Sequence, residues 1–430
     1  MKIKTLVLAM SVLALGHSAA IANDRFIDVI VTLKDKHHAN DHVMNRTNAE
    51  SFAVGLGLRP QHIYGAALTG FSARIPENRL VSLQSHPRVA NVAMDEPVYL
   101  VRQPSREHVN APPSSGGVTS NGQIVPWGVA RVSSQSNSNT GAGIEVYILD
   151  TGIDGNHRDL NVAGGFAVES CKGRGCGQKW FDDQGHGTHV AGSVAALDNS
   201  VDVVGVAPDA ILYAVKVLNK NGSGTRSGVI AGVDWVAQQA INKQKAVVAN
   251  MSLGGSGSKS GSCSNTGFTG TDTYHQAICN AKNVGVVFVV AAGNDGGDAA
   301  NAVPAAYDDA VITVSATNSS DNWPSWSNWG NKTASWTTKT SAPVAIAAPG
   351  VSILSTKMGG GTTTMSGTSM ASPHAAGGAA LIMATSNQSN NGTAFHNVRA
   401  TMLQKAESTA AFSNTSGKPH AENFLNAVDL

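Results

Sequence analysis

Three polar side chains, each in a glycine-containing segment, could together form a nucleophilic catalyst. They are an aspartate, a histidine and a serine: Asp150, His186 and Ser369. A serine hydroxyl is too weakly acidic to attack an amide unless a base takes its proton, and a carboxylate must hold that base. The set therefore predicts amide hydrolysis by Ser369, with His186 as the base and Asp150 as its support.

Each member of this set also has an ordinary structural alternative. Asp150 ends the apolar run 144–149, and an aspartate at a strand end is more often a turn or capping residue. His186 could pair with His189 on a metal, although the sequence around them lacks the glutamate-bearing helical pattern of common zinc proteases. We assign His189 to the core. Ser369 precedes an Ala-rich helical run and could be its N-cap.

A fourth residue, Asn294, could complete the site by binding an oxyanion. It follows the apolar run 284–291, and its side-chain amide could donate to developing negative charge. A serine at a helix N-terminus also directs its own backbone N–H toward such charge. The alternative for Asn294 is an ordinary Asn-Gly-type turn, which its glycine-rich neighbours also favour.

The elements that must position these residues lie between residues 123 and 430. Strand-like apolar runs alternate there with helical patterns, which predicts an α/β domain with a doubly wound, mostly parallel sheet. In such sheets chemistry collects at the carboxyl ends of the strands. The expected strands are 144–149, 211–217, 246–251 and 284–291, with helices after His186 and at 227–240.

The residues before 123 divide into three parts. Residues 1–22 combine Lys2 and Lys4 with an apolar run and small residues, which predicts a secretory signal; the run is shorter than the roughly 20 residues that a spanning helix needs. Residues 23–102 predict a small α+β unit with strands near 26–33, 70–75 and 87–95 and helices at 43–54 and 77–84. Residues 103–122 are rich in Pro, Ser and Gly and predict a flexible linker.

Composition excludes several classes of function. The 430-residue chain has a formal net charge of +1 and no dense basic run, so nucleic acid is not an expected partner. Beyond the N-terminus we find no long uncharged apolar stretch, so we expect no membrane attachment after signal cleavage. We expect a monomer that is secreted to the outside, with the periplasm as the second choice.

The four cysteines lie in an exported chain, where disulfides can form. Of three possible connectivities, nearest-neighbour pairing staples two Gly/Ser-rich loops: Cys171 with Cys176, and Cys263 with Cys279. A zinc site is the alternative, but neither pair has the two-residue spacing of zinc modules.

Three segments resemble the active-site blocks of the subtilisin-like serine proteases, in that family's Asp, His, Ser order. They are Asp150-Thr151-Gly152, His186-Gly187-Thr188-His189 and Gly367-Thr368-Ser369-Met370-Ala371. The resemblance covers about 123–430 and implies a broad serine endopeptidase with Asn294 in the oxyanion role and no organic cofactor. A catalytically silent binding protein, which would lack one of these residues, and a processor of its own chain alone are the rival functions.

The same resemblance implies a substrate cleft between two segments that bind the peptide backbone. The residues are Gly222, Ser223, Gly224, Ser252, Leu253, Gly254 and Gly293. Small residues around Gly254 and Gly293 predict a roomy pocket that favours large apolar side chains before the cut. Arg226 stands where many relatives carry an aromatic residue, so their preference at the distant pocket does not transfer.

Residues 26–99 resemble the propeptide of this family, which implies a ferredoxin-like intramolecular chaperone and inhibitor. The chain would then be an autoprocessed zymogen whose own propeptide is a partner, alongside protein and peptide substrates. The expected linker places the mature N-terminus between about residues 103 and 123.

Structural calcium is the implied ion, because Leu197–Val203 resembles the family's calcium loop. The oxygen ligands would come from Gln123, Asp159, Leu197, Asn199, Val201 and Val203. A polar surface loop is the alternative.

Overall fold

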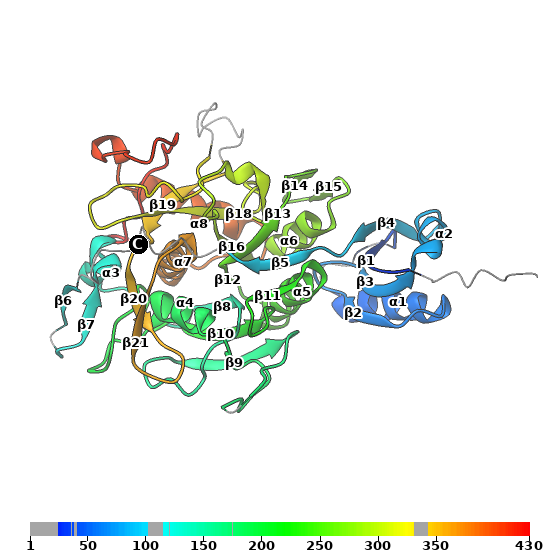
Figure 1. Cartoon of the computed structure of the whole chain (residues 1–430), viewed down its shortest axis with the longest axis horizontal. Helices are drawn as coiled ribbons and strands as arrows, with labels where there is room; N and C mark the ends of the chain where they lie inside the picture. Colours follow the sequence, from blue (N-terminus) through cyan, green and yellow to red (C-terminus); the bar gives the residue numbers. More distant parts are fainter. Residues whose placement is uncertain are drawn as a thin grey trace, which may run out of the picture.

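The computed structural model describes residues 25–35, 37, 41–101, 115–119, 121–173, 175–330 and 343–430. The expected signal segment, 1–22, lies outside these residues, as does most of the expected linker. Figure 1 shows a large body and a small one, joined by the extended strand β5 (Pro97–Leu100).

The large domain is built on a seven-stranded sheet in which every pairing is parallel. Its strands in spatial order are β19 (Ile346–Pro349), β18 (Val311–Thr317), β16 (Val286–Ala291), β12 (Val247–Met251), β8 (Glu145–Asp150), β10 (Ile211–Lys216) and β9 (Val162–Ala167). The strands from β19 to β8 are buried at every residue, as expected for a parallel sheet covered on both faces. The predicted doubly wound sheet is confirmed.

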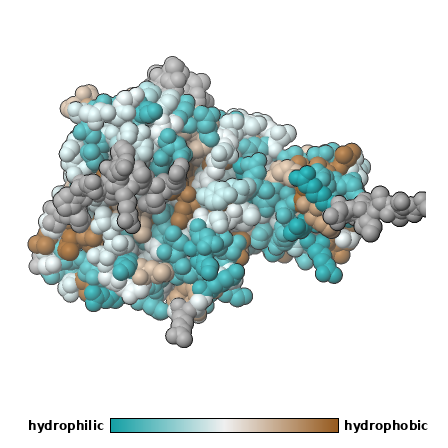
Figure 2. Space-filling model, viewed as in Figure 1, coloured by the Kyte–Doolittle hydropathy of each residue, from teal (hydrophilic) through white to brown (hydrophobic). Residues whose placement is uncertain are grey.

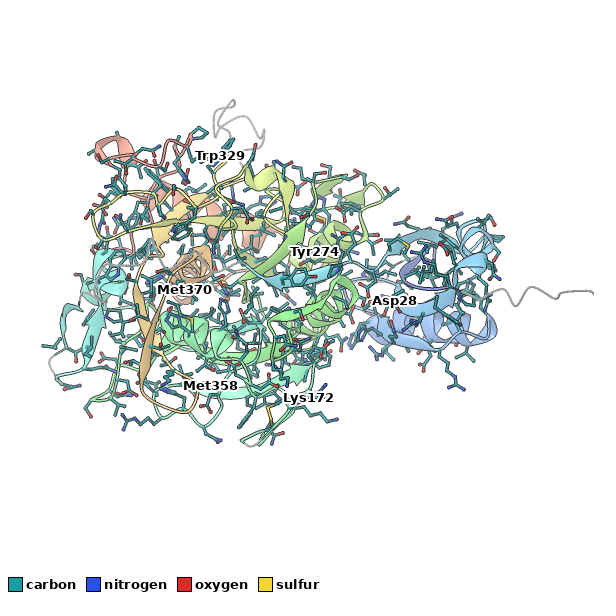
Figure 3. The ribbon with its side chains drawn as sticks, in the orientation of Figure 1. Asp28, Lys172, Tyr274, Trp329, Met358 and Met370 are labelled. Atoms are coloured by element: carbon teal, nitrogen blue, oxygen red, sulfur yellow. A yellow bond between two sulfur atoms is a disulfide. The ribbon has the colours of Figure 1, made fainter. Side chains whose placement is uncertain are left out.

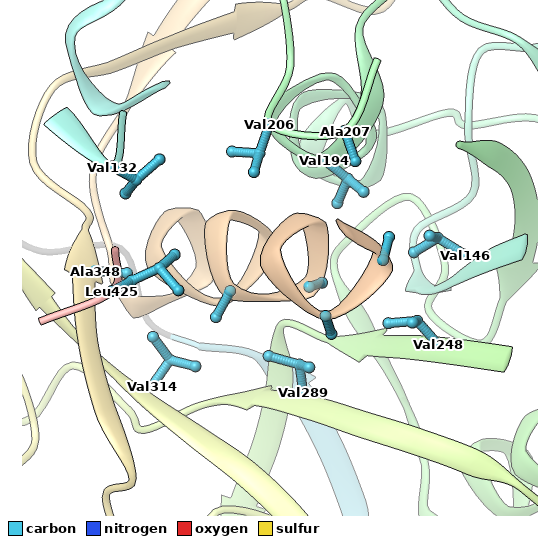
Figure 4. Close-up of a cluster of buried hydrophobic side chains, with 14 of the residues drawn as sticks. Val132, Val146, Val194, Val206, Ala207, Val248, Val289, Val314, Ala348 and Leu425 are labelled. Carbon is cyan, nitrogen blue, oxygen red and sulfur yellow. The ribbon is translucent and has the colours of Figure 1, made fainter. Parts of the chain in front are cut away.

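Alternate residues of the central strands supply two separate cores, one on each face of the sheet. The covering helices are α4 (His186–Ala195), α5 (Arg226–Lys243), α6 (Thr273–Asn283), α7 (Thr368–Thr385) and α8 (Thr393–Lys405). In β8, Val146 and Ile148 belong to the core around α4 and α7, whereas Tyr147 and Leu149 belong to the core around α5 and α6. Figure 4 shows α7 surrounded by apolar side chains, so the helix that carries Ser369 is fixed inside the domain.

The small domain has the strand and helix order of a ferredoxin-like fold. Its elements are β1 (Phe26–Leu33), α1 (His42–Gly55), β2 (Pro60–Tyr64), β3 (Gly70–Pro76), a 3₁₀ turn (Glu77–Arg79), α2 (Leu80–Gln84) and β4 (Val89–Met94). The antiparallel sheet runs β2-β3-β1-β4. Every predicted element of this unit is present, and β2 is an addition that the sequence analysis missed.

After β4 the chain enters the large domain as β5 and forms the second strand of a four-stranded sheet. That sheet is ordered β11 (Ser223–Thr225), β5, β13 (Leu253–Ser256) and β17 (Ala302–Val303). The remaining elements are β6 (Ser115–Val118), β7 (Ile124–Pro126), α3 (Trp127–Arg131), β14 (Ser262–Ser264), β15 (Gly267–Thr269), β20 (Ile353–Thr356), β21 (Thr362–Met365) and 3₁₀ turns at Ser134–Ser136, Ala299–Asn301 and Thr409–Ala411.

The expected linker, 103–122, contains regular structure at its end. Residues Ser115–Val118 form β6, which pairs with β7 in an antiparallel hairpin. The composition of this stretch predicted no order, but β7 supplies the backbone partners that the segment lacks by itself.

Both expected disulfides are present. Cys171 is bonded to Cys176 and Cys263 to Cys279, with Cα–Cα distances of 5.7 and 5.5 Å. The first closes a loop close to Lys172, which is labelled in Figure 3. The nearest-neighbour pairing is therefore confirmed, and the alternative of a zinc site is excluded because all four sulfur atoms are bonded.

The surface is mixed in character. Hydrophilic side chains cover much of the face in Figure 2, and several of the large exposed apolar side chains, such as Val43, Val54 and Val81, belong to the small domain. Among the helices of the described ranges, none is both apolar enough and long enough to span a bilayer.

Candidate active site

Asp150 and His186 meet at the carboxyl end of the central strand β8. His186 Nδ1 lies 2.9 Å from Asp150 Oδ1 and 3.0 Å from Oδ2. Asp150 is fully buried and His186 is 2% exposed, so water does not compete for this contact. The carboxylate therefore fixes the imidazole ring and leaves Nε2 as the free ring nitrogen.

The loop before α4 explains how the sequence places His186. Gly185, the N-cap, has a φ of +111°, which favours glycine. Asp182 is buried, and its carboxylate accepts hydrogen bonds from the backbone N–H groups of Gly185 and Thr188 at 2.9 and 3.0 Å. A Cβ at Gly187 would lie 2.1 Å from a carbonyl oxygen of the Asp150 turn. These glycines allow the helix to begin directly against the strand end.

Ser369 is the second residue of α7 and reaches the same edge of the sheet. Its hydroxyl lies 3.4 Å from the carbonyl oxygen of Ser252, which directly follows β12. A direct Ser369–His186 hydrogen bond is not formed here, since Nε2 of His186 has no hydrogen-bond partner among the residues that the structure describes.

His189, three residues after His186, is a core residue. Its Nε2 lies 3.0 Å from the carbonyl oxygen of Ile353, and burial lowers its pKa to about 3. It is therefore neutral and held by backbone. Within the described ranges, no group of three or more His, Cys, Asp or Glu side chains is placed to hold a metal.

Asn294 faces the N-terminus of α7. Its Oδ1 accepts hydrogen bonds from the backbone N–H and the hydroxyl of Thr368, at 2.9 and 2.8 Å. A Cβ at Gly367 would lie 2.9 Å from Asn294 Nδ2, so the amide nitrogen lies beside the turn that carries Ser369. The backbone N–H at the second helical position has no partner within the helix. Two donors thus lie near the hydroxyl of Ser369.

The two segments of the expected cleft pair with β5 in an antiparallel ladder. Gly224 pairs with Val98, Gly254 pairs with Tyr99, and the Gly222 carbonyl accepts the Leu100 N–H at 2.8 Å. Ser223 and Leu253 pair opposite Tyr99 and Leu100.

A cavity of about 650 Å³ lies at the end of β5. Its lining includes Val101, Gly254, Ala291, Gly293, Asp295 and Pro304. Because most of these side chains are small, the wall leaves room for a large apolar group. Asp295 contributes a carboxylate to the lining.

The six expected ion ligands lie together at a separate site. Gln123 Nε2 lies between 2.5 and 3.4 Å from five oxygens, which belong to Asp159, Leu197, Asn199, Val201 and Val203. An amide nitrogen has two hydrogens and cannot satisfy five oxygens. Burial also raises the pKa of Asp159 to about 6. The donor set therefore fits a hard cation better than it fits the amide.

A buried lysine behind the site was missed by the sequence analysis. Lys216 is fully buried at the end of β10 and pairs in register with Asp150. Its Nζ donates to the Thr151 carbonyl and to Asp183, both at 2.6 Å. A single lysine in the apolar run 211–217 was the available signal.

Comparison with known families decides the assignment. The sequence model of the "Subtilase family" matches residues 141–424, which is more than half of the chain. The chain belongs to the subtilase family. The model of "Peptidase inhibitor I9" matches residues 28–101, the small domain together with β5.

Individual relatives agree with this assignment. Subtilisin DY of Bacillus licheniformis is 41% identical over 268 residues, which make up 61% of this chain and 85% of that protein. A subtilisin of Bacillus pumilus is 37% identical over 300 residues, 68% of this chain and 94% of that protein. The crystal structure of a cold-adapted subtilisin-like serine proteinase, at 35% identity, matches with a TM-score of 0.56 over 70% of this chain and 98% of that one. This subtilase is therefore a serine endopeptidase made as a zymogen.

The propeptide of this subtilase is held by carboxylates on both sides of the interface. Asp234 of α5 accepts hydrogen bonds from the backbone N–H groups of Gly65, Ala66 and Ala67 at 3.0, 2.7 and 2.7 Å. Asp95 of the propeptide accepts from the N–H and the hydroxyl of Ser227 at 2.8 and 2.6 Å. Burial raises the pKa of Asp234. No sequence motif marked these contacts, because each joins residues more than a hundred positions apart.

Proposed function

We propose that Ser369 is the nucleophile of this endopeptidase. His186 takes the hydroxyl proton as Ser369 Oγ attacks the scissile carbonyl, and Asp150 holds the charged ring. The Ser369 backbone N–H and the Asn294 amide donate to the oxyanion. His186 then gives the proton to the leaving amine, and water hydrolyses the acyl-enzyme. The supporting observation is the buried contact of Asp150 with His186 beside the helix start that bears Ser369.

The first bond to be cut is inferred from the register of β5. Leu253 pairs with Leu100 in an antiparallel ladder. Continuing that ladder by one residue brings Val101 opposite Ser252, whose carbonyl oxygen is 3.4 Å from Ser369 Oγ. We therefore propose that the zymogen cuts itself between Val101 and Arg102, one residue before the end of the expected propeptide 23–102, so that Arg102 and not a residue of 103–123 is the first mature N-terminus.

Substrate preference follows from the two parts of the cleft. The glycine-rich strands β11 and β13 bind backbone, so many sequences fit. The cavity of about 650 Å³ favours a large apolar side chain before the cut, and Asp295 in its lining can accept a basic one. We propose broad specificity with this preference, in an enzyme exported by its signal segment 1–22 and acting outside the cell.

Calcium is the proposed structural ion. Gln123, Asp159, Leu197, Asn199, Val201 and Val203 would hold it. When bound, Ca²⁺ supplies positive charge for the buried Asp159 carboxylate and ties the 197–203 loop to the N-terminal segment of the large domain.

The test compares the wild type with Ser369→Ala and with Ser319→Ala, which changes an exposed serine. Intact mass and casein digestion are measured for each. The wild type and Ser319→Ala should lose the residues through Val101 and digest casein, whereas Ser369→Ala should do neither. Maturation and digestion by Ser369→Ala would contradict the mechanism; a wild type that matures but leaves casein intact would indicate a processor restricted to its own chain.

A further inference from the structure

Arg226 binds a carboxylate of the propeptide at the far end of the cleft. Its Nη2 lies 2.6 Å from Oε2 of Glu96, and its backbone N–H donates to the Glu96 carbonyl at 2.8 Å. The Arg226 side chain is 16% exposed and that of Glu96 is 52% exposed. The arginine is thus part of the enzyme wall, and the glutamate is the bound group.

The guanidinium of Arg226 also lies over an aromatic ring of the enzyme. Arg226 Cζ lies 5.8 Å from the ring centroid of Tyr274, which is 1% exposed and is labelled beside β5 in Figure 3. The neighbouring Asp272 caps α6 and accepts the Tyr307 hydroxyl at 2.9 Å. Arg226 Nε is buried and has no partner within the described part of the chain. The guanidinium therefore has donors left for an incoming acid.

The position of Glu96 is fixed by backbone pairing rather than by its own side chain. Thr225 pairs with Pro97, and the Arg226 N–H continues that ladder to Glu96. With the cut after Val101, Glu96 is the sixth residue before it. Any extended substrate that pairs with β11 in the same register places its sixth residue beside Arg226.

Two further features of this end of the cleft also favour a negatively charged partner. Arg226 is the first residue of α5, an 18-residue helix whose N-terminal end attracts anions. The preceding residue of the propeptide, Asp95, binds there through Ser227. The propeptide thus presents two consecutive carboxylates to this end of the cleft.

We propose that Arg226 forms a specificity subsite that selects glutamate or aspartate six residues before the cut. This inference rests on the proposed cleavage register and deepens the proposed function. Once the propeptide leaves, Arg226 is available to substrates, and proteins with an acidic residue at that position are cleaved faster. Because the pair is partly exposed, we expect a preference of roughly two- to fivefold at low salt.

The test uses the mature enzyme and quenched fluorescent peptides that are identical except at the sixth residue before the cut, which is Glu, Gln or Lys. The enzymes are the wild type, Arg226→Gln, Arg226→Glu and a control, Lys405→Gln, that removes an exposed lysine at the end of α8. The ratio of kcat/KM between peptides is compared within each enzyme, so differences in the fraction of active enzyme cancel.

The wild type and Lys405→Gln should favour Glu over Gln and Gln over Lys, and the preference should shrink in high salt. Arg226→Gln should show similar kcat/KM values for the three peptides, and Arg226→Glu should favour Lys over Gln and Gln over Glu. Equal ratios in the wild type, or an unchanged order in Arg226→Gln, would overturn the proposal. If no peptide is cut by the wild type, the proposed function fails instead.

Discussion

The carboxylate of Asp234, on the enzyme, lies 2.7 Å from the backbone nitrogen of Ala66, in the propeptide. The same oxygen accepts the N–H groups of Gly65 and Ala67, and the site is buried. A single enzyme side chain therefore satisfies three consecutive backbone donors of its inhibitor. Hydrogen bonds from buried donors to a charged group are among the stronger ones in proteins.

Asp234→Asn should weaken inhibition by the propeptide. The neutral amide loses the charge assistance of three hydrogen bonds, and we expect a cost of about 1.5–3 kcal/mol, or about ten- to a hundredfold in the inhibition constant. The constant is measured with the isolated propeptide added to mature enzyme. The exposed Asp209→Asn is the control; equal inhibition of all three enzymes would show that the contact is not needed for affinity.

Asp150→Asn should abolish most of the activity without unfolding the enzyme. An amide cannot stabilise the charged imidazole and can hold the wrong tautomer of His186, which lies 2.9 Å away. Replacement of the triad aspartate in other serine proteases lowers kcat on the order of 10⁴-fold, and we expect a similar loss of kcat here. Kinetics with a peptide substrate check this, alongside a melting curve. A loss below about tenfold would contradict the role of Asp150.

Val101→Asp should slow maturation by about tenfold or more. The substitution places a carboxylate at the mouth of the apolar cavity beside Asp295, where burial and like charge both oppose it. Tyr99→Asp is the matched control, because the Tyr99 side chain is 53% exposed and a carboxylate there keeps its contact with water. The rate is followed by gel and intact mass. Equal rates for the two variants would argue against cleavage after Val101.

The proposed calcium site should make stability depend on pH. Burial raises the Asp159 pKa from 3.8 to about 6, so the ion-free fold favours the protonated acid. The stability that the protonated Asp159 side chain contributes to the ion-free fold is present below about pH 4 and is lost as the pH rises through about 6. Calcium needs the ionised carboxylate and should therefore raise Tm more at pH 7.5 than at pH 5.

This pH effect is measured by thermal melting of Ser369→Ala, which prevents self-digestion, with calcium or with a chelator. Asp159→Asn in the same background should show a smaller gain from calcium and little change of that gain with pH. An equal Tm with calcium and with chelator at pH 7.5 would exclude a stabilising ion at this site.

The parts of the site that the sequence predicts are those with a local cause. Asp150 ends an apolar run, glycines flank His186, and Gly367 lies two residues before Ser369; positive φ values or close approach of other atoms require these glycines. A Cβ at Gly187, for example, would lie 2.1 Å from an oxygen of the Gly152 peptide. These requirements are visible in short stretches of sequence.

The parts that the sequence analysis missed depend on contacts between distant segments. Lys216 lies in a segment with the pattern of an ordinary strand. Only the fold brings Asp183 and the Thr151 carbonyl into contact with its side chain. Strand β6 lies in a Gly/Ser-rich stretch that has little propensity of its own, and its order comes from pairing with β7. The sequence shows that Arg226 differs from the residue in many relatives, but only the structure shows that its side chain pairs with Glu96.

The central claim is that Ser369 is activated by His186, and covalent labelling tests it most directly. Mature enzyme is treated with a fluorophosphonate, and the modified residue is located by peptide mass spectrometry in the wild type and in His186→Ala. We expect a single adduct on Ser369 that accompanies loss of activity, is blocked by added propeptide and is absent from His186→Ala. Inactivation with the adduct on another residue, or equal labelling of Ser369 in His186→Ala, would contradict the account.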